Sequence, residues 1–188
     1  REAWIAQATQ LAGHPELAAV GPGFVALRRE LVRALQQAGV PLMAGSDSQQ
    51  DFMVSGFSLH RELDALVAAG LTPLQALETA TRHPAAYLAR TAAAGTPIAG
   101  APPLGVVAPG AAADLLLVDG QPDQDIAATR RIAGVMHGGR WLDRAALDAM
   151  LANVEAGLAP AAAAPPANGT THPVWLVRHA EAGTGDDP

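Results

Sequence analysis

Asp47 is the residue of this sequence whose position is most suggestive of chemistry. It follows an apolar run at residues 40–44 and the two small residues Gly45 and Ser46. The run is continuously apolar rather than alternating, which is typical of a strand buried on both faces. An acid at the C-terminal end of such a strand, between two helices, lies where α/β barrels and doubly wound sheets place their chemistry. From residue type alone, a turn former or helix cap is the commoner role for such an aspartate.

Three further side chains are candidates for a functional site. His60 lies on the helix that we expect after the Asp47 turn, where it could face a substrate, and a solvated or core histidine is an equal alternative. Arg178 and His179 stand in an Arg-His-Ala-Glu sequence after a short apolar segment near the C-terminus. A pattern this short also arises by chance, so the odds that His179 is functional are near even.

Helical spacing of apolar residues precedes and follows Asp47, and a β-type pattern comes later. We expect helices at about residues 1–11, 24–37, 59–69 and 73–82, with a broken connection at 13–23. From residue 104 the period changes, and we expect short strands at 104–107, 114–118, 132–137 and 140–142. Gly138 and Gly139 form a good hairpin turn between the last two strands, and Asp143 can cap a final helix.

The composition excludes several classes of partner and site. The net charge is −6 with only 12 Lys and Arg residues among 188, which argues against nucleic acid or an anionic membrane as the main partner. There is no cysteine, so disulfides and thiolate metal sites are excluded. No apolar run reaches the roughly 20 residues that span a bilayer. The sequence begins with Arg1 inside an expected helix, so we interpret it as a fragment; its localisation stays unknown, with the cytoplasm favoured.

An ordered series of motifs resembles the C-terminal part of the metal-dependent amidohydrolases. The series is Gly45-Ser46-Asp47, Leu-His-Arg-Glu-Leu at 59–63, Ala-Gly-Leu-Thr-Pro-Leu-Gln at 69–75, Gly-Val-Val-Ala-Pro-Gly at 105–110, Ala-Asp-Leu-Leu-Leu-Val-Asp at 113–119 and Gly139-Arg140. No single motif is decisive, but the order is specific, and it reverses the odds for Asp47. The imidazolonepropionase-like and prolidase-like branch is the most similar, over roughly residues 1–155.

The resemblance implies an α/β fold: the C-terminal portion of a (β/α)8 TIM barrel plus part of a small β-sandwich. Residues 1–90 would supply the last strand and helices of the barrel, with residues 40–44 as the eighth strand. Residues 91–156 would complete the sandwich and end in a helix. Residues 157–172, rich in Ala and Pro, would be a linker.

The resemblance also implies a reaction. In this family one or two divalent ions, usually zinc, activate a water that attacks an amide-like carbon. Asp47 would then be both a metal ligand and the catalytic proton acceptor, and His60 would bind substrate. The other metal ligands of the family are missing from this sequence, so we expect the fragment to be inactive by itself. The expected substrate is a small amide, cyclic amide or dipeptide; a non-catalytic scaffold or partner module is an alternative, and a homo-oligomer stays open.

Residues 173–188 resemble the start of a different family, the histidine phosphatases. The usual Arg-His-Gly-Glu motif is present with Ala180 in place of Gly, as in the phosphohistidine-phosphatase-like branch. By this resemblance Arg178 would bind phosphate and His179 would accept the phosphoryl group, provided that the rest of the domain follows. A second activity in phosphoryl transfer is therefore a further alternative.

Overall fold

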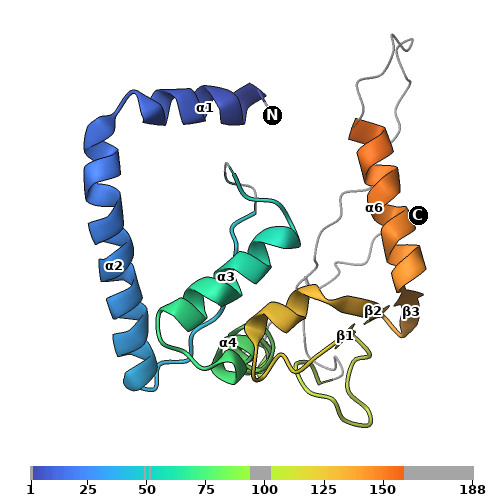
Figure 1. Cartoon of the computed structure of the whole chain (residues 1–188). Helices are drawn as coiled ribbons and strands as arrows, with labels where there is room; N and C mark the ends of the chain where they lie inside the picture. Colours follow the sequence, from blue (N-terminus) through green and yellow to red (C-terminus); the bar gives the residue numbers. More distant parts are fainter. Residues whose placement is uncertain (1, 49, 51, 94–102, 159–188) are drawn as a thin grey trace.

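The structure is a computed structural model, which describes residues 2–48, 50, 52–93 and 103–158 (Figure 1). Helices come first along the chain and a small antiparallel sheet follows, so a mixed helix and strand composition is confirmed. The elements are α1 (Glu2–Ala12), α2 (Pro15–Gln37), α3 (Phe57–Ala68), α4 (Pro73–Ala80), α5 (Arg82–Ala93), β1 (Leu115–Val118), the 3₁₀ helix η1 (Ile126–Arg130), β2 (Ile132–His137), β3 (Arg140–Asp143) and α6 (Arg144–Leu158). Among these helices, none combines the length and apolarity needed to cross a bilayer.

The first two helices lie at the edge of the molecule and leave much apolar surface exposed (Figure 1). α2 is continuous from Pro15, so the connection expected at residues 13–23 is wrong beyond His14. Pro15 stands at the first helical position, where a missing N–H costs nothing. Pro22 removes one backbone donor inside the helix, but its fixed φ is compatible with a helix, and α2 runs through it.

Residues 40–44 do not form the strand that the sequence predicts. They have no regular secondary structure and no strand partner among the described residues, and Val40 and Met43 are exposed. A strand is stabilised by ladder hydrogen bonds to its neighbours, and no described strand lies beside this segment. The predicted strand at 104–107 is also absent, and Val107 is 87% exposed.

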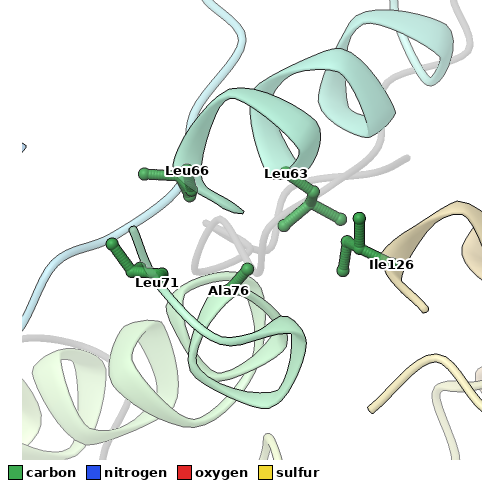
Figure 2. Packing of buried hydrophobic residues seen from close by; sticks show 5 residues of the cluster. All are labelled: Leu63, Leu66, Leu71, Ala76 and Ile126. Carbon is green, nitrogen blue, oxygen red and sulfur yellow. The ribbon is translucent and has the colours of Figure 1, made fainter. Parts of the chain in front are cut away.

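The core lies between α3, α4 and η1. Its buried members are Leu63 and Leu66 of α3, Leu71 of the turn, Ala76 of α4 and Ile126 of η1 (Figure 2). The turn between the two helices is specified locally because Thr72 and Gln75 form a reciprocal capping box at the start of α4.

The sheet has the order β1-β2-β3 with both pairs antiparallel. The hairpin between β2 and β3 turns at Gly138-Gly139 as predicted, with His137 opposite Arg140. The predicted cap of the last helix is also confirmed, since Oδ1 of Asp143 accepts a hydrogen bond from the Ala146 amide at 2.8 Å. The sheet therefore leads directly into α6.

Candidate functional site

Asp47 lies in the connection between residues 40–44 and α3, which we call the Asp47 loop (residues 45–56). Its side chain is exposed. Oδ2 accepts a hydrogen bond from Nε2 of Gln50 at 3.1 Å, and the Asp47 carbonyl accepts one from the Gln50 amide at 2.9 Å. The backbone of Asp47 is thus tied to a tight turn while its carboxylate remains accessible to water and solutes.

Backbone strain is concentrated in the same loop. Among the described residues, Asp47 (φ 48°) and Phe52 (φ 63°) are the only non-glycine residues with positive φ. Aspartate tolerates this region, but for phenylalanine it is a true outlier. Phe52 is held from outside by Trp4 of α1, whose ring centroid lies 5.7 Å away. Strained residues persist only where their surroundings fix them, and they collect at functional sites, so this loop is the strongest candidate site.

The segment before the loop is fixed from the side of α4 and α5. The Ala44 amide donates to the Thr79 carbonyl at 3.0 Å, and Nδ1 of His83 lies 2.7 Å from the Leu42 carbonyl. Because a carbonyl oxygen only accepts, Nδ1 of His83 carries the proton. These two bonds partly replace the strand ladder that is missing here.

α3 contacts the Asp47 loop at both the end and the start of the loop. The Val54 amide donates to Oγ of Ser58 at 2.8 Å, and the Ser58 amide donates to the Val54 carbonyl at 2.8 Å. Glu62, one turn further along α3, lies against the start of the loop. Burial raises the pKa of the Glu62 carboxyl, while the Arg28 guanidinium and the Gly45 backbone amide oppose this shift.

His60 lies on α3 but faces η1. Its Nδ1 is 3.0 Å from Oγ1 of Thr129, and the Thr129 hydroxyl donates to the Ile126 carbonyl at 2.8 Å. A hydroxyl has one proton, so Thr129 must accept from His60, whose Nδ1 is the protonated nitrogen. Burial lowers the pKa of His60, the nearby Arg130 lowers it further, and Asp64 opposes both. His60 is thus a neutral side chain, and among the described residues no hydrogen-bond partner of its Nε2 is found.

An ion pair lies beside this histidine. Both terminal nitrogens of Arg130 donate to the Asp64 carboxylate, and Nη2 also donates to the His60 carbonyl at 3.2 Å. The fork of a guanidinium matches the two oxygens of a carboxylate, so this pair has fixed geometry. The pair joins η1 to α3 and lies next to His60.

A largely apolar cavity of about 480 Å³ is found where α3, η1, β2 and α6 meet. Its lining residues are Gly56, Phe57, His60, Arg130, Ile132, Val135, Arg144, Leu147, Met150, Leu151 and Val154. Both arginines already bind carboxylates: Arg130 binds Asp64, and Nη2 of Arg144 is 2.7 Å from Asp148. The cavity therefore presents mainly apolar surface, and His60 is its main polar group without a counter-ion.

The predicted site residues are not brought together. Asp47 contacts Gln50 and His60 contacts Thr129, and in the described part of the chain no hydrogen bond joins the two candidates. The substrate-binding role of His60 stays a prediction. Arg178 and His179 lie outside the described residues, so the phosphatase-like tail stays a prediction as well.

Sequence reasoning missed the residues that hold the loop, which are Ser58, Glu62 and His83. The first two have a readable signal because they are four residues apart and so share one face of a helix. His83 has none, since its partner is a backbone carbonyl 41 residues earlier.

Comparison with known proteins identifies a family that the sequence matches. Residues 26–142, more than half of the chain, match the amidohydrolase family. No match was found among curated proteins. A crystal structure of an amidohydrolase is similar, with 25% sequence identity and a TM-score of 0.46 over 61% of this chain and 25% of that one. The present chain thus spans about a quarter of the length of that protein.

Proposed function

Because this chain belongs to the amidohydrolase family, we propose that it is the C-terminal part of a hydrolase that cleaves a C–N bond in a small amide, cyclic amide or dipeptide. The family match supports hydrolysis. The substrate class rests on the motif order, which resembles the imidazolonepropionase-like and prolidase-like branch. The single observation that carries the proposal is that the matched region contains Asp47 in its strained, solvent-accessible loop.

The role proposed for Asp47 is to accept a proton from the attacking water and return it to the leaving nitrogen. General acid–base catalysis of this kind needs a carboxylate within hydrogen-bond reach of the reacting water. The exposed carboxylate of Asp47 can be reached by both water and substrate. Its backbone is tied at both sides, so the side chain starts from a defined position.

Amidohydrolases generally use divalent metal ions, and the described residues do not form such a site by themselves. Among them, no group of three His, Cys, Asp or Glu residues is placed to hold a metal. A catalytic zinc takes about three protein ligands. Asp47 is one carboxylate, so the remaining ligands of a metal site would come from outside the described residues, and zinc is the ion that the resemblance favours.

We also propose the division of the chain that the motifs indicate. Residues 1–90 would belong to the barrel, 91–156 to a β-sandwich, and 157–172 to a linker before a histidine-phosphatase-like start at 173–188. Support comes from the apolar side chains that stay exposed in the described fold, such as Phe24 of α2, Leu117 of β1 and Met43, which precedes the Asp47 loop. Large exposed apolar surfaces of this kind mark interfaces.

The experiment uses the full-length protein that the gene encodes. Bound metal is measured first, and then amine release from a panel of dipeptides, N-acyl amino acids and small cyclic amides. The proposal predicts hydrolysis of one of these classes and its loss in Asp47→Asn. Hydrolysis that persists in Asp47→Asn with full metal occupancy would reject the assignment. A full-length protein without bound metal and without hydrolysis would instead favour the non-catalytic scaffold.

A further inference from the structure

We propose that α3 is the positioning element of the Asp47 loop and that Ser58 and Glu62 are the two residues through which it acts. Ser58 fixes the end of the loop and Glu62 fixes its start. The inference rests on the proposed function of Asp47, because it concerns the same carboxylate. It goes further by naming residues that touch neither the substrate nor the proposed proton acceptor.

Ser58 closes the loop. It is 5% exposed, and it makes two hydrogen bonds of 2.8 Å with Val54, one through its hydroxyl and one through its backbone amide. A buried hydroxyl would be costly if it had no partner. Ser58 thereby fixes the backbone only two residues beyond the strained Phe52.

Glu62 lies one helical turn after Ser58, so the two side chains share a face of α3. Its half-buried carboxyl lies near the Gly45 amide and the Arg28 guanidinium, which both oppose the rise of its pKa on burial. Leu42 and Ala44, just before the loop, pack against the core that includes Leu63 and Leu66 of α3, so this helix also contacts the segment at the start of the loop. The start of the Asp47 loop and its end are thus held by the same face of a single rigid helix.

The same segment is also bonded to the α4–α5 region. The Ala44 amide bonds to Thr79, and the Leu42 carbonyl accepts from His83. Residues 42–45 are therefore held both by α3 and by the α4–α5 region. The unusual φ of Asp47 is then a consequence of fixed ends, which is the circumstance in which strain persists.

The anchor at α3 also has its own support. Leu63 and Leu66 of α3 are buried in the core against Leu71 and Ala76 (Figure 2). A helix fixed by core packing is a rigid support, and catalytic groups are held more precisely by rigid elements than by loops alone. Removing either polar residue should therefore loosen the loop while the core remains intact.

The test is hydrogen exchange followed by mass spectrometry on the full-length protein, in peptides that cover residues 42–57. We expect exchange there to become about tenfold faster in Ser58→Ala and in Glu62→Ala, the size of effect that a lost hydrogen bond gives. Peptides from β2 and β3 should not change. Glu16→Ala is the matched control because this exposed carboxylate pairs with His14 at the start of α2, rather than on α3, α4 or α5.

Two conservative variants separate positioning from a loss of folding. Ser58→Thr keeps the hydroxyl, and Glu62→Gln keeps an acceptor oxygen of similar reach, so both should restore slow exchange in the loop. If a dipeptide such as glycyl-proline proves to be hydrolysed, Glu62→Ala should lower kcat about tenfold with KM changed less than about twofold, and Glu62→Gln should recover kcat.

The outcomes distinguish this inference from the proposed function. Unchanged exchange in both alanine variants would overturn the positioning role, whatever the activity. Faster exchange in a protein that hydrolyses none of the panel would support the positioning role while the proposed function failed. Equal acceleration in Glu16→Ala would also overturn the inference, because it would show a general loosening of the fold.

Discussion

Nδ1 of His60 and Oγ1 of Thr129 lie 3.0 Å apart, joining α3 to η1 across 69 residues of sequence. The bond links the helical part of the described chain to the segment that leads into the sheet. His60 is neutral in this arrangement, since burial and the neighbouring Arg130 both lower its pKa. The Nδ1 donor is present in both protonation states, so what disfavours the charged imidazole is its burial beside Arg130 rather than loss of this hydrogen bond.

Stability should depend on pH through His60. Its folded-state pKa lies below 6.5, so the unfolded chain binds protons more readily over the interval between the two values. The free energy of unfolding should be fully retained above about pH 6.5 and should fall as the pH drops toward the lowered pKa. His60→Asn keeps a donor for Thr129 but does not titrate. The free energy of unfolding of this variant, measured by urea denaturation between about pH 8 and pH 5, should therefore depend less steeply on pH than that of the unchanged protein.

His14→Asn is the matched control for this measurement. The His14 side chain is half exposed, and its Nδ1 lies 2.7 Å from the Glu16 carboxylate. Glu62 also has a shifted pKa, but it titrates equally in both variants, so it cancels from the comparison. If the free energy of unfolding depended on pH equally in His60→Asn and in the unchanged protein, the buried, neutral state of His60 would be contradicted.

The Arg130–Asp64 pair should be coupled more strongly than an ordinary surface pair. A double-mutant cycle with alanine at both positions should give about 1 kcal/mol, the upper end for partly exposed pairs, because the contact is bidentate. Arg144 and Asp148, an i,i+4 pair on α6, provide the comparison and should give about 0.3–0.5 kcal/mol. Equal coupling in the two cycles would show that the fork geometry adds nothing.

Gly105 should tolerate substitution much less than Gly110. Both have positive φ, so alanine is disfavoured at each by about 1 kcal/mol. At Gly105 a Cβ would also lie 2.6 Å from the Thr81 carbonyl and 2.8 Å from Cβ of Ala85, whereas nothing lies within 4 Å at Gly110. Gly105→Ala should therefore lower the free energy of unfolding by about 1–3 kcal/mol more than Gly110→Ala.

The two variants are compared by chemical denaturation under one condition. A similar loss of unfolding free energy in the two variants would mean that residues 103–107 do not pack against α4 and α5 as the structure shows. The comparison tests this packing directly, because the backbone strain is common to both sites.

The features that the sequence predicted best are those specified by neighbouring residues. The capping box of Thr72 and Gln75, the Gly138-Gly139 turn and the Asp143 cap each depend on residues within three positions of one another. Such local signals act before tertiary contacts form, so they survive in the fold. The connection predicted at residues 13–23 was wrong because the fixed φ of Pro22 is compatible with a helix, and α2 continues through this residue.

The strand predicted at residues 40–44 shows the opposite case. A strand depends on partners, and within the described residues the hydrogen bonds of this segment go to Leu35 and Thr79, near the ends of two helices, and to His83. The candidate site follows the same rule. Asp47 was found from its local context, whereas the contact of His83 with Leu42 depends on folding over 41 residues and has no sequence signal.

The most direct test of the central claim is the hydrolysis rate of the full-length protein with Asp47→Asn. Asparagine also tolerates positive φ, so the loop and the free energy of unfolding should change little. The account predicts a fall in kcat of about 10²–10⁴-fold, the usual contribution of a general acid–base group. A kcat within about twofold of the unchanged protein, with the variant folded, would contradict it.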